Sequence, residues 1–98
     1  MSRMIRNVVV GRVRPDVSRA QLEEALAAIA ALEPDGCLDM RMGADAGLRE
    51  GNWSFCITAD FSDEDAYRRY DLEDEHNRIR RELFAPICEE IVRVQFAA

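Results

Sequence analysis

The sequence contains no lysine, because all thirteen basic residues among its 98 residues are arginine. A Schiff-base lysine, a lysine general base and a phosphate-binding loop with its lysine are therefore excluded. Nineteen acidic residues give a formal net charge of -6 at pH 7, and the arginines form no basic stripe with interleaved aromatic residues. Both features argue against nucleic acid as a partner, because an acidic chain repels a phosphate backbone.

Histidine, cysteine and long apolar stretches are also scarce. His76 is the only histidine, so a metal site built on two histidines is excluded. The three cysteines, Cys37, Cys56 and Cys88, form no Cys-x-x-Cys pair, which predicts reduced thiols in a cytoplasmic protein. No stretch approaches the roughly 18 apolar residues of a membrane span, and the first residues lack the apolar stretch of a signal peptide. We therefore expect a cytoplasmic protein without a membrane partner.

The composition is that of a folded domain. Apolar residues make up 48% of the chain and charged residues 33%, which is too hydrophobic for a disordered chain. The length fits a single domain, which we place at residues 4–98. A chain this short buries only about 60 to 65% of its unfolded surface, so its size alone predicts self-association.

Alternation and helical periodicity predict four strands and two helical regions, the second of them broken near Asp71 and Leu72. Strands are expected at residues 5–14, 37–42, 52–61 and 91–96, and helices at 18–32, 62–70 and 74–84. Ser18 and Gln21 form a capping box at the start of the first helix. The second and third strands should pair as a hairpin. The order β-α-β-β-α-β predicts an α+β, ferredoxin-like fold, with the helices on one face of a four-stranded antiparallel sheet.

The two faces of this sheet should differ in character. The residues expected to face the helices are Val9, Val13, Trp53, Phe55, Ile57 and Phe61, with Leu22, Leu26 and Ile29 from the first helix. The opposite face should carry Val8, Val10, Arg12, Ser54, Cys56 and Thr58. That second face is too apolar to be left in solvent, so we expect a homodimer that packs through it.

His76 is the residue of the second helical region that most needs an explanation. With Ile79 and Leu83 it forms the apolar edge of the predicted helix. A helix that faces a core usually carries leucine or isoleucine at such a position. Three interpretations are open. In the first, His76 is a core residue that hydrogen-bonds a backbone carbonyl, Tyr70 or Asn7. In the second, it contacts a ligand without taking part in chemistry, and in the third it is a general base.

The charged residues around His76 are expected to be solvated. Consecutive carboxylates point in different directions around a helix, so this acidic run does not predict a metal site. The run comprises Asp71, Glu73, Asp74 and Glu75. The neighbouring arginines, Arg78, Arg80 and Arg81, are expected on the exposed face of the helix, in i,i+4 pairs with acidic or amide side chains.

Several stretches of the chain together carry a resemblance that covers nearly its whole length. They are residues 4–14, 18–32, 61–67, 70–76 and 91–96. In their order and spacing they resemble the stress-responsive A/B barrel domain family. This resemblance implies a dimeric α+β barrel built from ferredoxin-like protomers, whereas it does not by itself fix an activity.

The resemblance also suggests site residues. Tyr70 and His76 are similar in spacing to the catalytic tyrosine and histidine of polyketide cyclases of the olivetolic acid cyclase type. The family's His-Pro-Ala-His stretch is replaced here by Glu73–His76, Asn7 stands where the first strand often has histidine, and Ile29 replaces a second pocket tyrosine. The candidate catalytic residues are therefore His76 and Tyr70, and the candidate ligand-binding residues are Asn7, Ile29, Tyr70 and His76.

Three functions follow as alternatives. The first is the binding of a small apolar or aromatic molecule between sheet and helices. The second is a lyase or cyclase in which His76 removes a proton next to a carbonyl and Tyr70 stabilises the enolate. The third is a structural, stress-associated oligomer without catalysis, and a monooxygenase that works without a cofactor is a further option. None of them implies a cofactor or a metal, and a cavity beside His76 would favour the first two.

Overall fold

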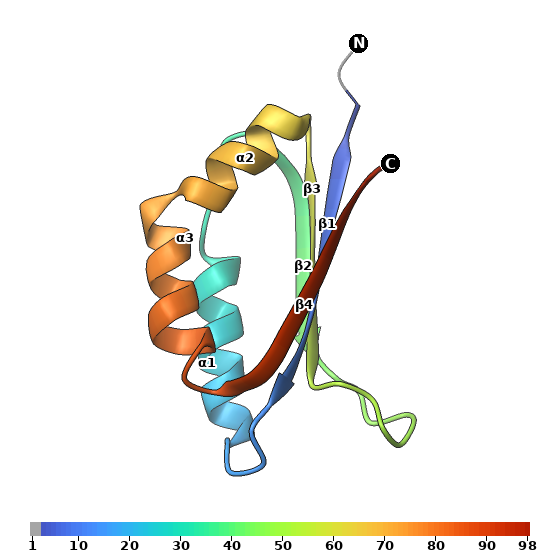
Figure 1. Cartoon of the computed structure of the whole chain (residues 1–98), viewed down its shortest axis with the longest axis vertical. Helices are drawn as coiled ribbons and strands as arrows, with labels where there is room; N and C mark the ends of the chain where they lie inside the picture. The colour runs from blue at the N-terminus through green and yellow to red at the C-terminus, as the bar shows by residue number, and fades with distance from the viewer. Residues whose placement is uncertain (1–2) are drawn as a thin grey trace.

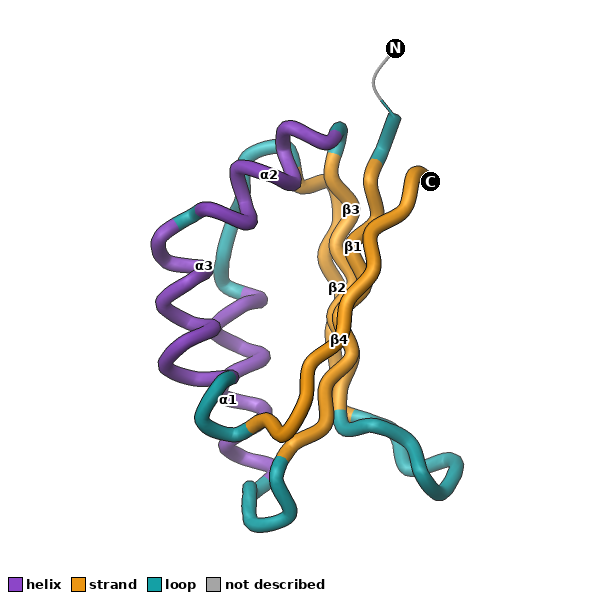
Figure 2. Tube along the Cα trace, viewed as in Figure 1, coloured by secondary structure: helices purple, strands orange, loops and turns teal. Residues whose placement is uncertain are grey.

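The four strands form one antiparallel sheet in the order β2-β3-β1-β4, and the helices cover one of its faces (Figure 1). The computed structural model describes residues 3–98. Its elements are β1 Ile5–Val13, α1 Arg19–Ala30, β2 Cys37–Ala44, β3 Phe55–Phe61, α2 Glu64–Leu72, α3 Asp74–Ile79, the π-helical segment η1 Arg80–Phe84, and β4 Cys88–Ala97. This is the ferredoxin-like α+β fold that the order of the elements predicts, with two layers and one bare sheet face (Figure 2).

Local sequence signals fix the start of α1 and the pairing of β2 with β3. The Ser18 hydroxyl oxygen accepts a hydrogen bond from the Gln21 amide at 3.2 Å, and the Gln21 side chain accepts one from the Ser18 amide at 2.9 Å. These two bonds satisfy amide groups at the open end of the helix, so the predicted capping box is confirmed. The predicted hairpin is also confirmed, because β2 and β3 are antiparallel neighbours.

The position predicted for Trp53 is wrong. The alternation of the third strand extends to Trp53 in the sequence, but β3 begins only at Phe55, and the chain bends at Ser54. Trp53 is half-buried, and the guanidinium of Arg12 lies over its ring at 4.5 Å from the centroid. The tryptophan therefore contributes a cation–π contact at the end of the sheet rather than core packing.

The core lies between the sheet and the helices. It combines Leu22, Leu26 and Ile29 of α1 with Phe55, Ile57 and the later residues Ile79, Phe84, Ile87 and Cys88. A second cluster gathers around the fully buried Phe61, which contacts Tyr67 and Tyr70 with ring centroids at 5.8 and 5.1 Å. All the residues predicted to face the helices except Trp53 pack in or against these clusters.

Gly11 makes room for the aromatic ring of Phe55. A Cβ atom added at Gly11 would lie 2.2 Å from Cζ of Phe55, and that ring in turn packs against Phe84 at 5.5 Å between centroids. We expect Gly11→Ala to displace the ring and to lower the free energy of unfolding by about 1 to 3 kcal/mol, as overpacked cores do. Gly43→Ala is the matched control, because nothing lies within 4 Å of a Cβ atom there. Urea denaturation measures both, and equal stabilities of the two variants would contradict this packing.

The helix expected at residues 74–84 is divided into two parts. Glu73 interrupts the helical region, and its carboxylate accepts hydrogen bonds from the amides of Glu75 at 2.9 Å and His76 at 2.6 Å, which starts α3. After Ile79 the chain widens into the π-helical segment η1, where the Ala85 amide donates to the Arg80 carbonyl at 2.8 Å. Such π turns are rare and occur often at functional sites.

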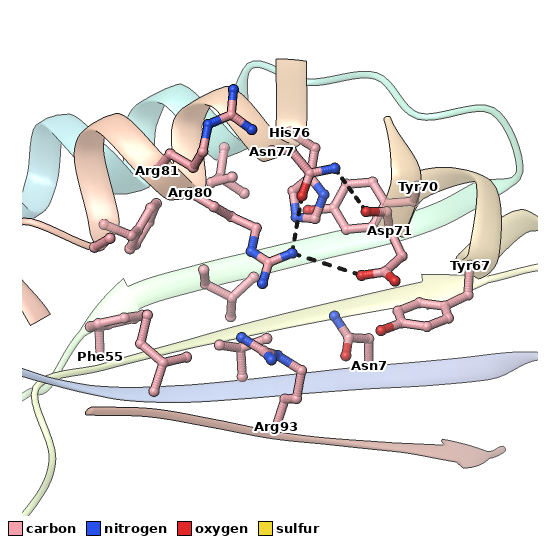
Figure 3. Close-up of a pocket in the computed structure, with 16 residues that line it drawn as sticks. Asn7, Phe55, Tyr67, Tyr70, Asp71, His76, Asn77, Arg80, Arg81 and Arg93 are labelled. Carbon is pink, nitrogen blue, oxygen red and sulfur yellow. Dashed lines mark hydrogen bonds and ion pairs between the residues drawn. The ribbon is translucent and has the colours of Figure 1, made fainter. Parts of the chain in front are cut away.

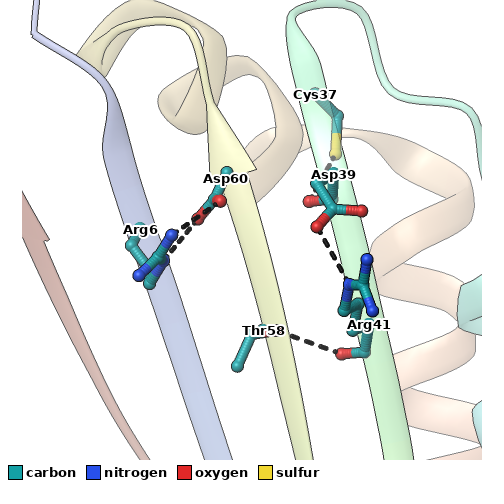
Figure 4. Close-up of polar contacts among 6 residues, drawn as sticks. All are labelled: Arg6, Cys37, Asp39, Arg41, Thr58 and Asp60. Carbon is teal, nitrogen blue, oxygen red and sulfur yellow. Dashed lines mark hydrogen bonds and ion pairs between the residues drawn. The ribbon is translucent and has the colours of Figure 1, made fainter. Parts of the chain in front are cut away.

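The outer face of the sheet carries no helix and exposes apolar side chains. Val92, Val94 and Phe96 of β4 are 46%, 56% and 45% exposed, and Val8 and Val10 lie beside them on β1. At one end of this face Arg6 donates two hydrogen bonds to Asp60, at 2.7 and 3.0 Å (Figure 4). This pairing holds the pKa of the Asp60 carboxyl below its ordinary value.

Among residues 3–98, no helix is long and apolar enough to cross a membrane.

Candidate functional site

A cavity of about 360 Å³ lies between the inner face of the sheet and the helices (Figure 3). Its wall is formed by Asn7, Val9, Ile29, Phe55, Ile57, Tyr67, Tyr70, Asp71, His76, Asn77, Arg80, Arg81, Phe84, Ala85, Ile91 and Arg93. The four residues that the sequence suggested, Asn7, Ile29, Tyr70 and His76, thus border the same cavity, Asn7 from the sheet and the other three from α1, α2 and α3.

Asn7 presents an amide group to the cavity from the middle of the sheet. Its side-chain oxygen accepts a hydrogen bond from Nε2 of Gln95, its register partner on β4, at 2.7 Å. The residue is only 6% exposed, and its amide nitrogen points toward the cavity (Figure 3). Asn7 therefore retains a hydrogen-bond donor for a ligand, while its oxygen is already used.

Tyr70 and His76 form an aromatic stack across the break between α2 and α3. Their ring centroids are 3.9 Å apart and the ring planes differ by 26°. Phe61 also contacts Tyr70, with ring centroids 5.1 Å apart. No hydrogen bond joins the Tyr70 hydroxyl to the imidazole in the part of the chain that the structure describes. The two groups would therefore act on a ligand separately and not as a hydrogen-bonded pair.

The His76 imidazole is held neutral and incompletely hydrogen-bonded. Burial lowers its pKa, the nearby charge of Arg80 lowers it further, and the Tyr70 backbone carbonyl and two carboxylates oppose these effects. Its Nδ1 atom is buried without a hydrogen-bond partner among residues 3–98. Of the partners considered for a core histidine, a backbone carbonyl, that of Tyr70, interacts with the imidazole, whereas Asn7 bonds Gln95 instead.

The lowered pKa of His76 predicts a pH-dependent stability. The unfolded chain takes up the proton first, near the ordinary histidine pKa of about 6.5, so the stability present above that pH is lost as the pH falls toward the folded-state value. The slope cannot exceed about 1.4 kcal/mol per pH unit for each protomer. Urea denaturation between about pH 7.5 and 5.5 measures it, above the range where Asp60 and Glu73 titrate.

His76→Phe is the control for this pH dependence. Phenylalanine keeps an aromatic ring against Tyr70 but has no titratable group, so the decline in stability across this range should be much reduced. An unchanged slope in His76→Phe would show that another group causes the effect.

Both tyrosines of the cavity remain protonated at neutral pH. Burial raises the pKa of the Tyr70 hydroxyl far above its ordinary value, and burial followed by the charge of Asp71 raises the pKa of Tyr67. Each hydroxyl is therefore available as a hydrogen-bond donor. Neither is suited to act as a phenolate base.

A polar cluster borders the cavity where α2, α3 and η1 meet. Nη1 of Arg80 donates to the Asn77 side-chain oxygen at 3.1 Å and lies 3.9 Å from Asp71, and Asn77 donates to the Asp71 carbonyl at 2.9 Å (Figure 3). The predicted exposed position of Arg80 is wrong, because the residue is half-buried and forms part of the cavity wall. Arg80 stands four residues after His76, and its amide donates to the His76 carbonyl, so α-helical spacing places both side chains on the same face.

Arg93 is a cavity residue that the sequence did not single out. It lies on β4 opposite Val9, on the inner face, between the outward-facing Val92 and Val94. The alternation of apolar and polar residues along the last strand was the sequence signal that could have identified Arg93 as inward-facing.

Among residues 3–98 no group of three or more histidine, cysteine or acidic side chains is placed to hold a metal, and the three cysteines are free.

Solved structures similar to this chain share its fold over nearly their whole length. A dimeric ferredoxin-like protein of unknown function from Thermobifida fusca is 29% identical, with a TM-score of 0.89, and the match covers 100% of this chain and 93% of that one. A hydroxynitrile lyase from Passiflora edulis is 18% identical, with a TM-score of 0.85 and coverages of 100% and 95%. A cofactor-independent oxygenase from Streptomyces nogalater is 18% identical, with a TM-score of 0.78 and coverages of 99% and 94%.

The similar structures include further proteins described as dimeric, from Bacteroides fragilis and Jannaschia. No curated protein matches the chain. The family described as Stress Responsive A/B Barrel Domain matches residues 5–98, which include every strand, every helix and the whole cavity wall. The chain belongs to the stress-responsive A/B barrel domain family.

Proposed function

We propose that the protein binds a small apolar or aromatic molecule in the cavity between its sheet and its helices. The observation that carries this proposal is the cavity of about 360 Å³ beside His76, in a place where a purely structural protein would pack side chains. Ligand sites are typically concave, mostly apolar and about 300 to 1,000 Å³ in volume, with a few polar groups that orient the ligand.

The wall of the cavity supports this proposal by its chemistry. Ile29, Phe55 and Ile57 give it an aliphatic and aromatic lining, and Tyr70 offers a flat ring that is itself stacked on His76. Asn7 adds a donor at the sheet side. A ligand with an apolar body would thus bury its surface in the cavity, while one or two polar groups fix its orientation.

A lyase or cyclase is the second candidate. The neutral His76 and the protonated Tyr70 have the protonation states needed to remove a proton next to a carbonyl and to stabilise the resulting enolate oxygen. However, Nδ1 of His76 is enclosed, so a substrate reaches it only after the ring or its neighbours shift. We therefore rank binding without chemistry first.

The outer sheet face supports a homodimer. Val10 pairs in register with Cys56 on β3 and Val92 on β4, and this apolar surface would be left in water by a monomer. A second copy packed on this surface, related by a two-fold axis, would bury at least roughly 1,200 Å² in total.

The three free cysteines, which lack any paired arrangement, support a cytoplasmic location.

Thermal-shift screening of the wild type and His76→Ala against a panel of aromatic, aliphatic and polyketide-like compounds tests the binding proposal. We expect wild-type hits that weaken in His76→Ala, because the variant removes one layer of the aromatic stack on the wall. Cys88→Ala is the matched control, since Cys88 is buried but lies outside the cavity and should lose stability without losing the hits. No wild-type hit, together with a destabilised His76→Ala, would reject the proposal in favour of a core role for His76.

A further inference from the structure

The cavity has a charge opposite in sign to that of the whole chain. The chain carries a net charge of -6, yet the cavity wall includes three arginines, Arg80, Arg81 and Arg93, and one carboxylate, Asp71. His76 is neutral because its pKa is lowered by burial. Arg81 directs its guanidinium away from the cavity, so the two inward-facing arginines against Asp71 leave an excess of one positive charge (Figure 3).

Two of these arginines converge on the same space. Arg80 points into the cavity from η1, and Arg93 points toward it from β4 on the opposite wall, whereas the Arg81 guanidinium points away (Figure 3). Like charges that face one another repel, and the repulsion is stronger beside a low-dielectric wall than in open water. The arrangement therefore favours an anion between the two guanidinium groups.

Arg6 and Arg78 are more fully neutralised than these two, although Arg12, Arg14, Arg49 and Arg69 also have no ion pair among residues 3–98. Arg6 binds Asp60 through two hydrogen bonds, and Arg78 lies between two glutamates. The only ion pair of Arg80 among residues 3–98 is with Asp71, at 3.9 Å, and its Nη1 donates a hydrogen bond to the neutral side chain of Asn77. Arg93 has no ion pair within residues 3–98, and its register partner is Val9.

Tyr67 adds a hydroxyl group to the cavity wall that carries Arg80 and Arg93. Burial and Asp71 raise the pKa of Tyr67, while the charges of Arg93, Arg80 and the exposed Arg68 oppose this rise. Tyr67 belongs to the cavity wall, so its hydroxyl, Arg80 and Arg93 define a polar end of the cavity. The Asn7 amide nitrogen points toward the same space (Figure 3).

The π turn borders this polar end. In η1 the i to i+5 bond from the Ala85 amide to the Arg80 carbonyl adds a residue to the turn. Arg80 faces the cavity by its i,i+4 spacing from His76, and Arg81, Phe84 and Ala85 of the same segment also border the cavity. Such turns are rare and occur often at functional sites.

From this geometry we infer that the ligand is an organic carboxylate, whose apolar or aromatic body fills the cavity while its carboxylate lies between Arg80 and Arg93. The inference rests on the proposed binding function and specifies its ligand class. Guanidinium groups match carboxylates in shape and donate paired hydrogen bonds to them, and such charge-assisted bonds are stronger than neutral ones. Tyr67 and Asn7 supply neutral donors beside the arginines.

A matched pair of compounds tests this inference. The probes are 2-naphthoate and 2-naphthamide, which share the same aromatic body and nearly the same shape but differ in charge. Titration calorimetry at about pH 7.5 measures their affinities, since the carboxylate is then ionised and His76 is neutral. We expect 2-naphthoate to bind roughly tenfold or more tightly than the amide.

Charge-removing variants locate the preference. Arg93→Gln should abolish most of the preference for 2-naphthoate over 2-naphthamide, and this substitution breaks no ion pair among residues 3–98. Arg80→Gln should also reduce it, whereas Arg19→Gln, which makes the same change in net charge on an exposed part of α1 outside the cavity, should leave it intact. Circular dichroism confirms that each variant is folded before titration.

The possible results separate this inference from the binding proposal. Equal affinities for the two compounds, or a carboxylate preference that survives in both Arg93→Gln and Arg80→Gln, would overturn the inference and leave cavity binding standing. Failure of both compounds to bind the wild type would count against both. A preference lost in Arg93→Gln and kept in Arg19→Gln supports the carboxylate site.

Discussion

Replacing Val10 with aspartate should turn the protein into a monomer or an unfolded chain. Val10 lies on β1 between Cys56 of β3 and Val92 of β4, in the apolar outer face that we propose packs against a second copy. A carboxylate there would be buried without a partner, which costs several kcal/mol in an interface. Sedimentation equilibrium at micromolar concentration measures the change in mass.

Leu48→Asp is the control for this experiment. Leu48 is 85% exposed in the loop before β3, so the same type of substitution should leave the dimer and its stability unchanged. A wild-type protein that sediments as a folded monomer would reject the dimer. A Val10→Asp variant that remains dimeric would show instead that the copies associate through another surface.

Leu26→Ala should lower the free energy of unfolding by about 2 to 5 kcal/mol. Leu26 is 6% exposed on the inner face of α1 and packs in the main core cluster, but it does not border the ligand cavity. Its truncation therefore creates a new void as well as removing buried methyl groups. Urea denaturation gives the change in stability directly.

Leu72→Ala provides the comparison at a surface position. Leu72 ends α2 with 77% of its surface exposed, so the same truncation should cost little. Similar losses in the two variants, or no loss in Leu26→Ala, would contradict the packing of α1 on the sheet.

The fold could be predicted from the sequence because its signals are local and mutually consistent. The capping box of Ser18 and Gln21 marks the start of α1, and the alternation of Phe55, Ile57 and Phe61 gives β3 one buried face. Trp53 continues that alternation in the sequence, but the bend at Ser54 ends the strand. Periodicity alone does not show where backbone pairing stops.

The site was predictable only in part. The unusual place of His76 on an apolar helix edge drew attention to the right region, and the family resemblance added Asn7, Ile29 and Tyr70, all of which border the cavity. Arg80 was expected on the exposed face, although its i,i+4 spacing from His76 was a signal that both residues lie on one side of the helix. The cavity itself depends on the distance between two layers, which no local signal contains.

The family and the similar structures fix the fold of this chain more firmly than its chemistry. Proteins of the same fold include a hydroxynitrile lyase and a cofactor-independent oxygenase, each 18% identical to this chain. At that identity the likeness concerns the fold alone, because functional groups are placed on a fold independently. The proposed function therefore rests on the side chains of the cavity wall and not on the likeness of fold.

Ligand binding in the cavity is tested most directly by amide chemical shifts of ¹⁵N-labelled protein, which locate bound small molecules in a screen of aromatic and aliphatic compounds. We expect hits to shift the amides of Asn7, Tyr70, His76 and Arg93, which border the cavity from both the sheet and the helices. No hits, or shifts confined to the outer-face residues Val8, Val10, Val92 and Val94, would contradict binding in the cavity.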